Sequence, residues 1–277
     1  GSAKIIAEGG KVLRAYGTFP HPNVFGAFMV IGLLAMYYFW LKRPSEWKIW
    51  SGWKTLRSDL FYGLVIFVIT LGLVLAFSRA AWIVADVVTL VVVGYSLLVR
   101  RNWVQAVRLS ILLFAVAVIL FFGFKDFILP RAQVSPSEPA VTQRLGYNDI
   151  AINLIKNNFL GVGIGNQVLY SVKNEIYKKF GMNQVWQWQP IHNIYLLMGA
   201  EIGVLGLLAF LLFIGTLLFS HFSIIHNSLF IIPATMLSAL LLLGLFDHYL
   251  WTLQPGRLML WFIIGIVLAQ KHTRNNS

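Results

Sequence analysis

The chain of 277 residues contains no cysteine, and few of its residues carry a charge. The missing cysteine excludes a disulfide framework, a thiolate nucleophile and any metal site built on thiolates. Only 12% of the residues are charged, whereas 58% are hydrophobic and the mean hydropathy is +0.74. A soluble domain with so few charged groups would lack the polar surface that it needs. The composition therefore predicts an integral membrane protein.

Acidic residues are also scarce, with 10 Asp and Glu against 22 Lys and Arg, so the formal net charge is +12. Such a balance is typical either of nucleic-acid binding or of cytoplasmic loops that face anionic lipid. In a chain with several apolar runs we favour membrane lipid and expect no nucleic-acid partner. No HxH, HExxH or DxD pattern occurs, so the sequence predicts no metal site and no cofactor.

The apolar runs predict an all-α polytopic membrane protein with about seven transmembrane helices. The expected spans are 24–41, 60–77, 81–99, 107–124, 192–219, 228–246 and 257–269. They divide the chain into an N-terminal approach segment with four spans (1–124), a large external loop (125–191), and three spans with a cytoplasmic tail (192–277). Pro20 and Pro22 exclude a regular helix before the first span, and Asn23 is its expected cap.

The large loop shows helical spacing of apolar residues in two places. Each segment is too short and too charged to cross a bilayer, so amphipathic helices at the membrane surface or over the bundle are expected. The glycine-rich stretch 161–166 predicts a turn between them, because no strand precedes it as in a phosphate-binding loop. Residues 130–142 predict an irregular flap. The two apolar sets are Tyr147, Ile150 and Leu154, and Leu169, Val172, Ile176 and Phe180.

Lys and Arg are concentrated after the first span, after the third span and in the tail, which places these segments in the cytoplasm. By alternation the N-terminus, the 78–80 turn, the 125–191 loop and the 247–256 turn lie outside. The external side then collects six polar residues close to the ends of spans. They are Arg79, Arg144, His192, Asp247, His248 and Arg257.

An arginine at this depth either extends its side chain to the interface or binds an anion. Arg79 favours binding, since it occupies a three-residue turn on the side where the charge rule predicts no arginine. Asp86, two turns further along the helix, either positions Arg79 or is paired inside the bundle. Two arginines that converge on one pocket would suit a diphosphate, because each guanidinium presents a planar fork of donors.

His192 has two interpretations, a capping or packing residue or a general base with an unperturbed pKa of roughly 6.5. Asp247 either orients that imidazole or caps a helix. Glu201 lies nine residues after His192 and therefore on the opposite helix face. With Gly199 and Gly203 beside it, Glu201 predicts close helix packing with one buried hydrogen bond.

Taken in order, five motifs resemble the O-antigen ligase/O-antigen polymerase superfamily. The resemblance covers nearly the whole chain but matches only the C-terminal part of such proteins. It implies that a leading group of transmembrane helices is absent, which agrees with the N-terminus placed outside. The start at Gly1-Ser2, without Met, is typical of a cleaved expression tag or an internal fragment. The motifs are Thr18-Phe-Pro-His-Pro-Asn-Val-Phe-Gly26, Phe77-Ser-Arg-Ala-Ala-Trp82, Arg144 at the start of an amphipathic helix, Asn158-Phe-Leu-Gly-Val-Gly-Ile-Gly-Asn166, and His192-Asn-Ile-Tyr-Leu followed by Glu201-Ile-Gly-Val-Leu-Gly206.

The resemblance implies a metal-independent, membrane-embedded glycosyltransferase in the bacterial cytoplasmic (inner) membrane. It would move a glycan from an undecaprenyl-diphosphate donor to an acceptor hydroxyl on the periplasmic face. In this scheme His192 is the base and Asp247 the acidic residue of the site. Arg79 and Arg144 bind the donor diphosphate, and Arg257 and Asn193 complete the expected substrate-binding set.

Nothing in the sequence names the acceptor. A polymerase would use a growing lipid-linked glycan, a ligase the lipid A core, and a protein O-oligosaccharyltransferase a protein. A transporter or flippase-like protein is the alternative from another class, and it would need polar groups at the bilayer midplane or paired broken helices. Asp86 and Glu201 are the acids well inside spans, which favours a reaction at one face. The third alternative is a non-catalytic fragment without its N-terminal helices.

Overall fold

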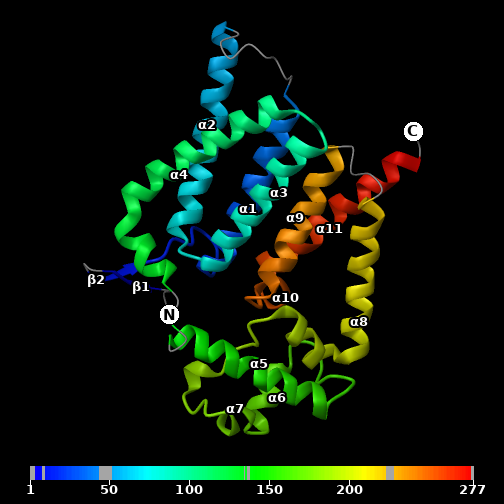
Figure 1. The fold of residues 1–277 in the computed structure, drawn as a ribbon. Helices are drawn as coiled ribbons and strands as arrows, with labels where there is room; N and C mark the ends of the chain where they lie inside the picture. Colours follow the sequence, from blue (N-terminus) through cyan, green and yellow to red (C-terminus); the bar gives the residue numbers. More distant parts are fainter. Residues whose placement is uncertain are drawn as a thin grey trace. The chain divides into compact units, whose positions relative to one another are not determined.

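The computed structural model describes residues 4–7, 10–43, 52–133, 135, 138–222 and 228–275. Within these ranges the chain is helical apart from one antiparallel hairpin, β1 (Lys4–Ala7) and β2 (Gly10–Leu13), which the composition did not predict (Figure 1). The chain forms two compact units. The first comprises Gly1–Gln133, His221–Ala239 and Ile263–Ser277, and the second Val134–Ser220 and Leu240–Phe262.

Five helices in the described part of the chain are long and apolar enough to cross a membrane. They confirm the first five expected spans, since about 20 helical residues at 1.5 Å each match the hydrocarbon thickness. The sixth and seventh spans are also helical, α9 (Ser228–Gly244) and α11 (Gln254–Asn275), but their apolar parts are shorter. The five are Pro22–Leu41, Arg57–Leu75, Arg79–Leu98, Trp103–Ala132 and Ile194–Phe219.

Four of these helices build the first unit: α1 (Pro22–Leu41), α2 (Gly52–Leu75), α3 (Arg79–Leu98) and α4 (Trp103–Ala132). Helix α1 packs on α2 and α3, and both of these also pack on α4. Helix α4 continues eight residues beyond the expected end of its span, with a kink at Phe124 (φ −130°, ψ 15°). The irregular segment expected at 130–142 is therefore shorter, because α4 ends at Ala132 and α5 begins at Pro139.

The prediction that Asn23 caps the first span was wrong. His21, not Asn23, is the N-cap of α1, and its Nδ1 accepts a hydrogen bond from the backbone N–H of Asn23 at 3.2 Å. Pro22 then takes the first helical position, where its missing N–H leaves nothing unsatisfied. The Asn23 side chain instead accepts a hydrogen bond from Arg14 Nη2 at 2.7 Å, which ties the approach segment to α1.

The short connection between α2 and α3 confirms the expected tight turn between these two helices, and Arg79 is the first residue of α3. Phe77 adopts a left-handed conformation there (φ 46°), so the turn exposes backbone carbonyls. Two of them accept hydrogen bonds from arginines of other segments. Arg14 Nε donates to Ala76 O at 2.8 Å and Arg131 Nε donates to Phe77 O at 3.1 Å.

The second unit contains the large loop, and its first helix α5 (Pro139–Asn157) confirms the expected amphipathic pattern. Tyr147, Ile150 and Leu154 are at most 2% exposed and belong to a core shared with α6 (Gln167–Lys173) and α7 (Ile176–Lys179). Figure 1 shows α5, α6 and α7 side by side. The prediction of a single second helix across Leu169, Val172, Ile176 and Phe180 was wrong. Glu175 is left-handed (φ 55°) and separates α6 from α7, and Leu169 is 66% exposed.

Helix α8 (Ile194–Phe222) is interrupted at Gly203, whose φ of 73° and ψ of 176° are accessible essentially to glycine alone. The glycine-rich turn at 158–166 lies against this break. Turn and helix exchange three backbone hydrogen bonds, so backbone polar groups freed by the break have partners, as a break in a membrane helix requires. These are Val204 N to Phe159 O (3.1 Å), Val162 N to Ala200 O (2.9 Å) and Gly163 N to Glu201 O (2.9 Å).

Candidate functional site

His192 lies in the last turn of chain before α8. Its neighbour Asn193 is the residue that caps the helix, because Asn193 Oδ1 accepts hydrogen bonds from the N–H groups of Tyr195 and Leu196 at 3.0 and 3.1 Å. Ile191, on the other side, is fully buried. His192 is thus held between a buried anchor and a helix cap and is not itself the cap. Substrate binding by Asn193 stays a prediction beside this capping role.

Two contacts orient the imidazole of His192. Its Nδ1 lies 2.9 Å from the carbonyl oxygen of Pro190, and its ring stacks on Tyr147 with centroids 5.1 Å apart and planes inclined by 10°. A carbonyl oxygen only accepts hydrogen bonds, so Nδ1 carries the proton and Nε2 of the neutral ring keeps its lone pair. The site therefore presents an unprotonated nitrogen.

The surroundings favour this neutral form. Burial lowers the pKa of His192, while the Asp247 carboxylate acts in the opposite direction and the Arg144 guanidinium lowers the pKa further. Burial also raises the pKa of Tyr147 to about 12, so its phenol stays protonated and donates to Gln187 O at 2.8 Å. His192 thus carries the electronic state that a general base requires.

Asp247 and His248 follow α9 and precede the short helix α10 (Tyr249–Thr252). Asp247 is 6% exposed, and its Oδ1 accepts a hydrogen bond from His248 N at 2.7 Å. His248 Nδ1 lies 2.6 Å from Thr252 Oγ1, which itself donates to His248 O at 3.2 Å. Nδ1 of His248 and Oγ1 of Thr252 are thus hydrogen-bonded partners, and Nε2 of His248 lies 3.9 Å from Asp247 Oδ1.

The structure brings His192, Asp247 and His248 together, with one nitrogen or oxygen of each within 4.8 Å of the others. The rings of the two histidines meet edge to face, with centroids 4.8 Å apart. His192 and Asp247 thus belong to one cluster, the orientation of the imidazole by Asp247 stays a prediction, and the N-cap of α10 is His248, not Asp247. His248 belonged to the external polar set but had no predicted role, because contact between segments so distant in sequence leaves no local pattern.

The predicted arginines differ in their surroundings. Arg144 lies one turn before Tyr147 on α5 and is partly buried, near enough to His192 to act on its charge. Arg257 is exposed in the first turn of α11. Among the residues that the structure describes, neither guanidinium has a hydrogen-bond or ion-pair partner. Both therefore keep their donors available, and their role in substrate binding stays a prediction.

Arg79 belongs to the first unit, where it is the first residue of α3. It is partly exposed, and its Nη1 lies 3.4 Å from Gln133 O. Asp86 is exposed and forms no ion pair within the described ranges. Neither role expected for Asp86, positioning Arg79 or pairing inside the bundle, is therefore seen.

A model of the O-antigen ligase family matches residues 63–211, which is more than half of the chain. The chain belongs to the O-antigen ligase family. The match includes Arg79, Arg144, His192 and Asn193, and Asp247 follows it in the sequence. At family level this makes the chain a multi-pass membrane protein of the ligase or polymerase type of glycosyltransferase. No curated protein and no solved structure matches the chain.

Glu201 stabilises the fold of this O-antigen ligase family member away from the histidines. It is 3% exposed, its Oε2 accepts a hydrogen bond from Trp251 Nε1 at 2.7 Å, and its Oε1 accepts one from Gln167 N at 3.3 Å. Helices α8, α10 and α6 are thereby joined. The expected packing role is confirmed, with one buried and one partly buried hydrogen bond in place of a single buried one.

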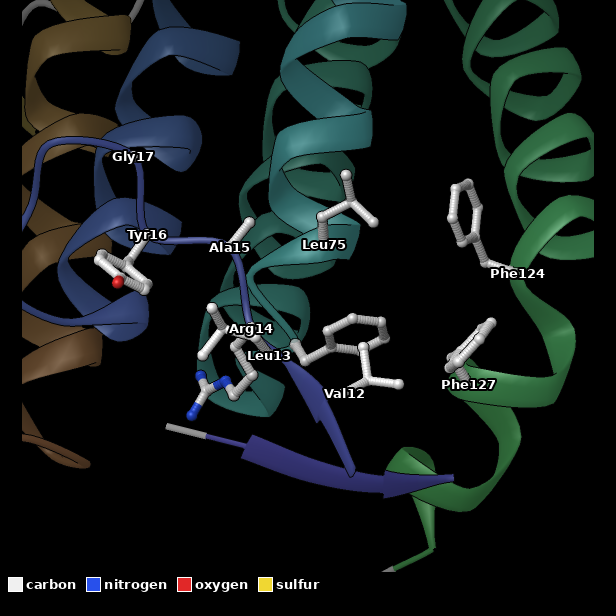
Figure 2. Close-up of a pocket in the computed structure, with 10 residues that line it drawn as sticks. Val12, Leu13, Arg14, Ala15, Tyr16, Gly17, Leu75, Phe124 and Phe127 are labelled. Atoms are coloured by element: carbon white, nitrogen blue, oxygen red, sulfur yellow. The ribbon is translucent and has the colours of Figure 1, made fainter. Parts of the chain in front are cut away.

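The first unit of this O-antigen ligase family member also contains a cavity of about 400 Å³. In Figure 2 Phe124 and Phe127 of α4 face Leu75 of α2 and Val12 of β2 across it. Arg14 is the charged residue of the lining, and its guanidinium is already bound to Ala76 O and Asn23 Oδ1. None of the predicted site residues lines this cavity, so we describe it as an apolar pocket and not as a reaction centre.

Proposed function

We propose that the protein transfers a glycan from undecaprenyl diphosphate to an acceptor hydroxyl at the outer face of the cytoplasmic membrane, with His192 as general base. The single observation that carries this proposal is the orientation of His192. Its Nδ1–H is held by Pro190 O and its ring by Tyr147, so Nε2 of the neutral ring is unprotonated, and the buried Asp247 belongs to the same cluster.

In the proposed step Nε2 of His192 takes the proton of the acceptor hydroxyl while that oxygen attacks the anomeric carbon of the donor glycan. A new carbon–oxygen bond forms, and the bond from the anomeric carbon to the diphosphate oxygen breaks. Undecaprenyl diphosphate leaves with the electron pair. The Asp247 carboxylate stabilises the imidazolium formed at His192, as carboxylates beside acid–base histidines do.

Arginines take the place of a metal ion in this scheme. The leaving diphosphate accumulates negative charge, which a planar guanidinium stabilises through two parallel hydrogen bonds. Arg144 has all its donors available, and Arg79 stands at the first turn of a 20-residue helix, where the helix dipole adds positive potential. Arg257 and Asn193 are the remaining predicted contacts to substrate.

The break in α8 at Gly203 is a feature that transporters also use, because unwound backbone can coordinate a substrate or an ion. Here the freed groups at the break are bound to the 158–166 turn through three hydrogen bonds. The break therefore offers no open coordination site within the described residues. This observation favours the transferase over the transporter.

The proposal is tested by reconstituting the purified protein in liposomes with a lipid-diphosphate-linked glycan and a panel of acceptors, with the products identified by mass. A longer lipid-linked glycan identifies a polymerase, and a glycosylated lipid A core identifies a ligase. We expect His192→Ala to abolish transfer while the protein still elutes as a monodisperse peak. Transfer at the wild-type rate in this variant would refute the assignment of the base.

A further inference from the structure

We propose that His192, Asp247 and His248 form a binding site for a divalent transition-metal ion of the Zn²⁺ class, and that an ion bound there blocks transfer. The binding is independent of the proposed function. The block rests on it, since it requires His192 to act as the base.

The first argument is the state of the two imidazoles. Metal-binding histidines almost always donate their second ring N–H to a carbonyl, carboxylate or similar acceptor, which fixes the tautomer and orients the ring. His192 donates Nδ1–H to Pro190 O, and His248 Nδ1 lies 2.6 Å from its partner Thr252 Oγ1. Both residues therefore have at Nδ1 the partner that a metal ligand uses in its outer shell, and Nε2 is the nitrogen that would bind the ion.

The second argument is the donor set. Two neutral imidazole nitrogens and one carboxylate oxygen are ligands that Zn²⁺ accepts, and three protein ligands leave a fourth position open. The ligand atoms lie within 4.8 Å of one another. In a tetrahedral site with bonds of about 2.0–2.1 Å they would be about 3.4 Å apart. An ion bound here would therefore require rotation of the side chains of His248 and Asp247, which adjoin in sequence.

The third argument concerns charge. Asp247 is buried, so its carboxylate would attract at short range any cation that enters the site. Arg144 is the opposing charge, because it acts on His192 from α5. The site is thus selective for an ion that binds imidazole covalently, and hard cations such as Mg²⁺ lack the oxygen ligands that they require here.

Metal binding and base catalysis exclude each other at this site. Both use the lone pair on Nε2 of His192, so a coordinated ion removes the acceptor for the hydroxyl proton. Micromolar Zn²⁺ should therefore inhibit transfer, and a chelator should restore it.

The binding is measured on protein stripped with a chelator and kept in detergent. Zn²⁺ is titrated against a competing fluorescent indicator, and Co²⁺ is read from its visible absorption bands. We expect one bound equivalent in the wild type, and its loss in His248→Ala and Asp247→Asn. Thr252→Val removes only the partner of His248 and should weaken binding roughly 10- to 100-fold. Arg144→Gln should strengthen binding, since it removes the opposing charge.

His21→Asn is the matched control, because it removes a histidine of the first unit and keeps a good N-cap for α1. It should bind like the wild type. No bound equivalent in the wild type, or equal affinity in the wild type and the folded His248→Ala and Thr252→Val variants, would overturn the site.

The transfer assay then separates the two proposals, with each variant compared with its own metal-free rate. We expect Zn²⁺ to inhibit transfer by the wild type, and His248→Ala to need at least about tenfold more Zn²⁺ for the same inhibition. This result would support the block. Stoichiometric binding without any transferase activity would overturn the proposed function but not the site. Activity that EDTA abolishes and Zn²⁺ restores would overturn the block, because the ion would then take part in the reaction.

Discussion

The imidazole of His192 lies on the phenol ring of Tyr147, with the two planes inclined by only 10°. Tyr147 is 2% exposed and comes from α5, so this amphipathic helix sets the direction of the proposed base. We expect Tyr147→Leu to lower the transfer rate up to about tenfold, because a stacked aromatic pair contributes roughly 0.5–1.5 kcal/mol. Tyr147→Phe keeps the ring and should keep most of the rate. Steady-state rates with saturating donor check both.

Tyr177→Phe is the control for the loss of the Tyr147 hydroxyl. Tyr147→Phe removes the hydrogen bond to Gln187 O and should destabilise the fold by about 1 kcal/mol. Tyr177→Phe removes a comparable bond to Gln189 O in the same core. Equal losses of rate in Tyr147→Phe and Tyr147→Leu would show that the hydroxyl, and not the ring, positions His192.

Gly203 should not tolerate a side chain. A Cβ at this position would lie 2.4 Å from Phe159 O and 2.6 Å from Leu160 C, and its φ and ψ are strained for any other residue. Gly203→Ala should destabilise the protein by about 1–3 kcal/mol from the backbone alone, with the collision in addition. Gly215→Ala in the same helix meets nothing within 4 Å and is the control. Thermal unfolding in detergent would contradict this prediction if both variants melted at the same temperature.

Much of the fold could be predicted because local sequence carries it. The apolar runs reflect the thickness of the bilayer, and the spacing of Tyr147, Ile150 and Leu154 reflects the helical period. Interruptions within helical patterns were harder to predict. Glycine is common in membrane helices, so Gly203 looked like a packing residue, and only the 158–166 turn that binds there reveals the break. The left-handed Glu175 has no such local signature.

The site was predictable in part for the same reason. His192 stands at a boundary between polar loop and apolar helix, which sequence shows directly. The contact of His192 with His248 depends on how α8 and α10 pack, so no spacing rule could have found it. Metal motifs describe ligands within one segment, so they carry no information about this cluster of three residues. The tautomer of His192 follows from Pro190 O, and the partner of His248 Nδ1 is Thr252 Oγ1; only the fold defines these contacts.

Glu201 and Trp251 should be energetically coupled. The Trp251 Nε1–H donates to Glu201 Oε2 at 2.7 Å, and the other carboxyl oxygen accepts from Gln167 N. Glu201→Gln replaces one carboxylate oxygen by an NH₂ group, which then faces an N–H donor of Trp251 or Gln167. Trp251→Phe removes the indole N–H and leaves the Glu201 carboxylate buried without that donor. Each variant should cost about 1–3 kcal/mol, and the double variant should cost less than the sum. Additive unfolding free energies across this double-mutant cycle would show that the two residues act independently.

Arg144 is the most direct test of how the donor is held. Its guanidinium has no protein partner in the described ranges and acts on His192, so a diphosphate bound there would lie beside the base. Arg144→Gln should raise the KM for the lipid-diphosphate donor and lower kcat/KM by about 10- to 100-fold, and Arg144→Lys should fall between, because lysine lacks the planar fork. Donor titrations in liposomes at fixed acceptor measure both constants.

Lys178 supplies the matched control for Arg144. It is a basic residue of the same loop, but its ammonium is already paired with Glu175 at 2.7 Å and both side chains are more than half exposed. Lys178→Gln should therefore leave the donor KM unchanged, since an exposed ion pair contributes little. A rise in donor KM of the same size in both variants would show that the loop attracts the donor through its overall charge. A rise confined to Arg144 means that its guanidinium contacts the diphosphate, because only a directional contact distinguishes two cations of one loop.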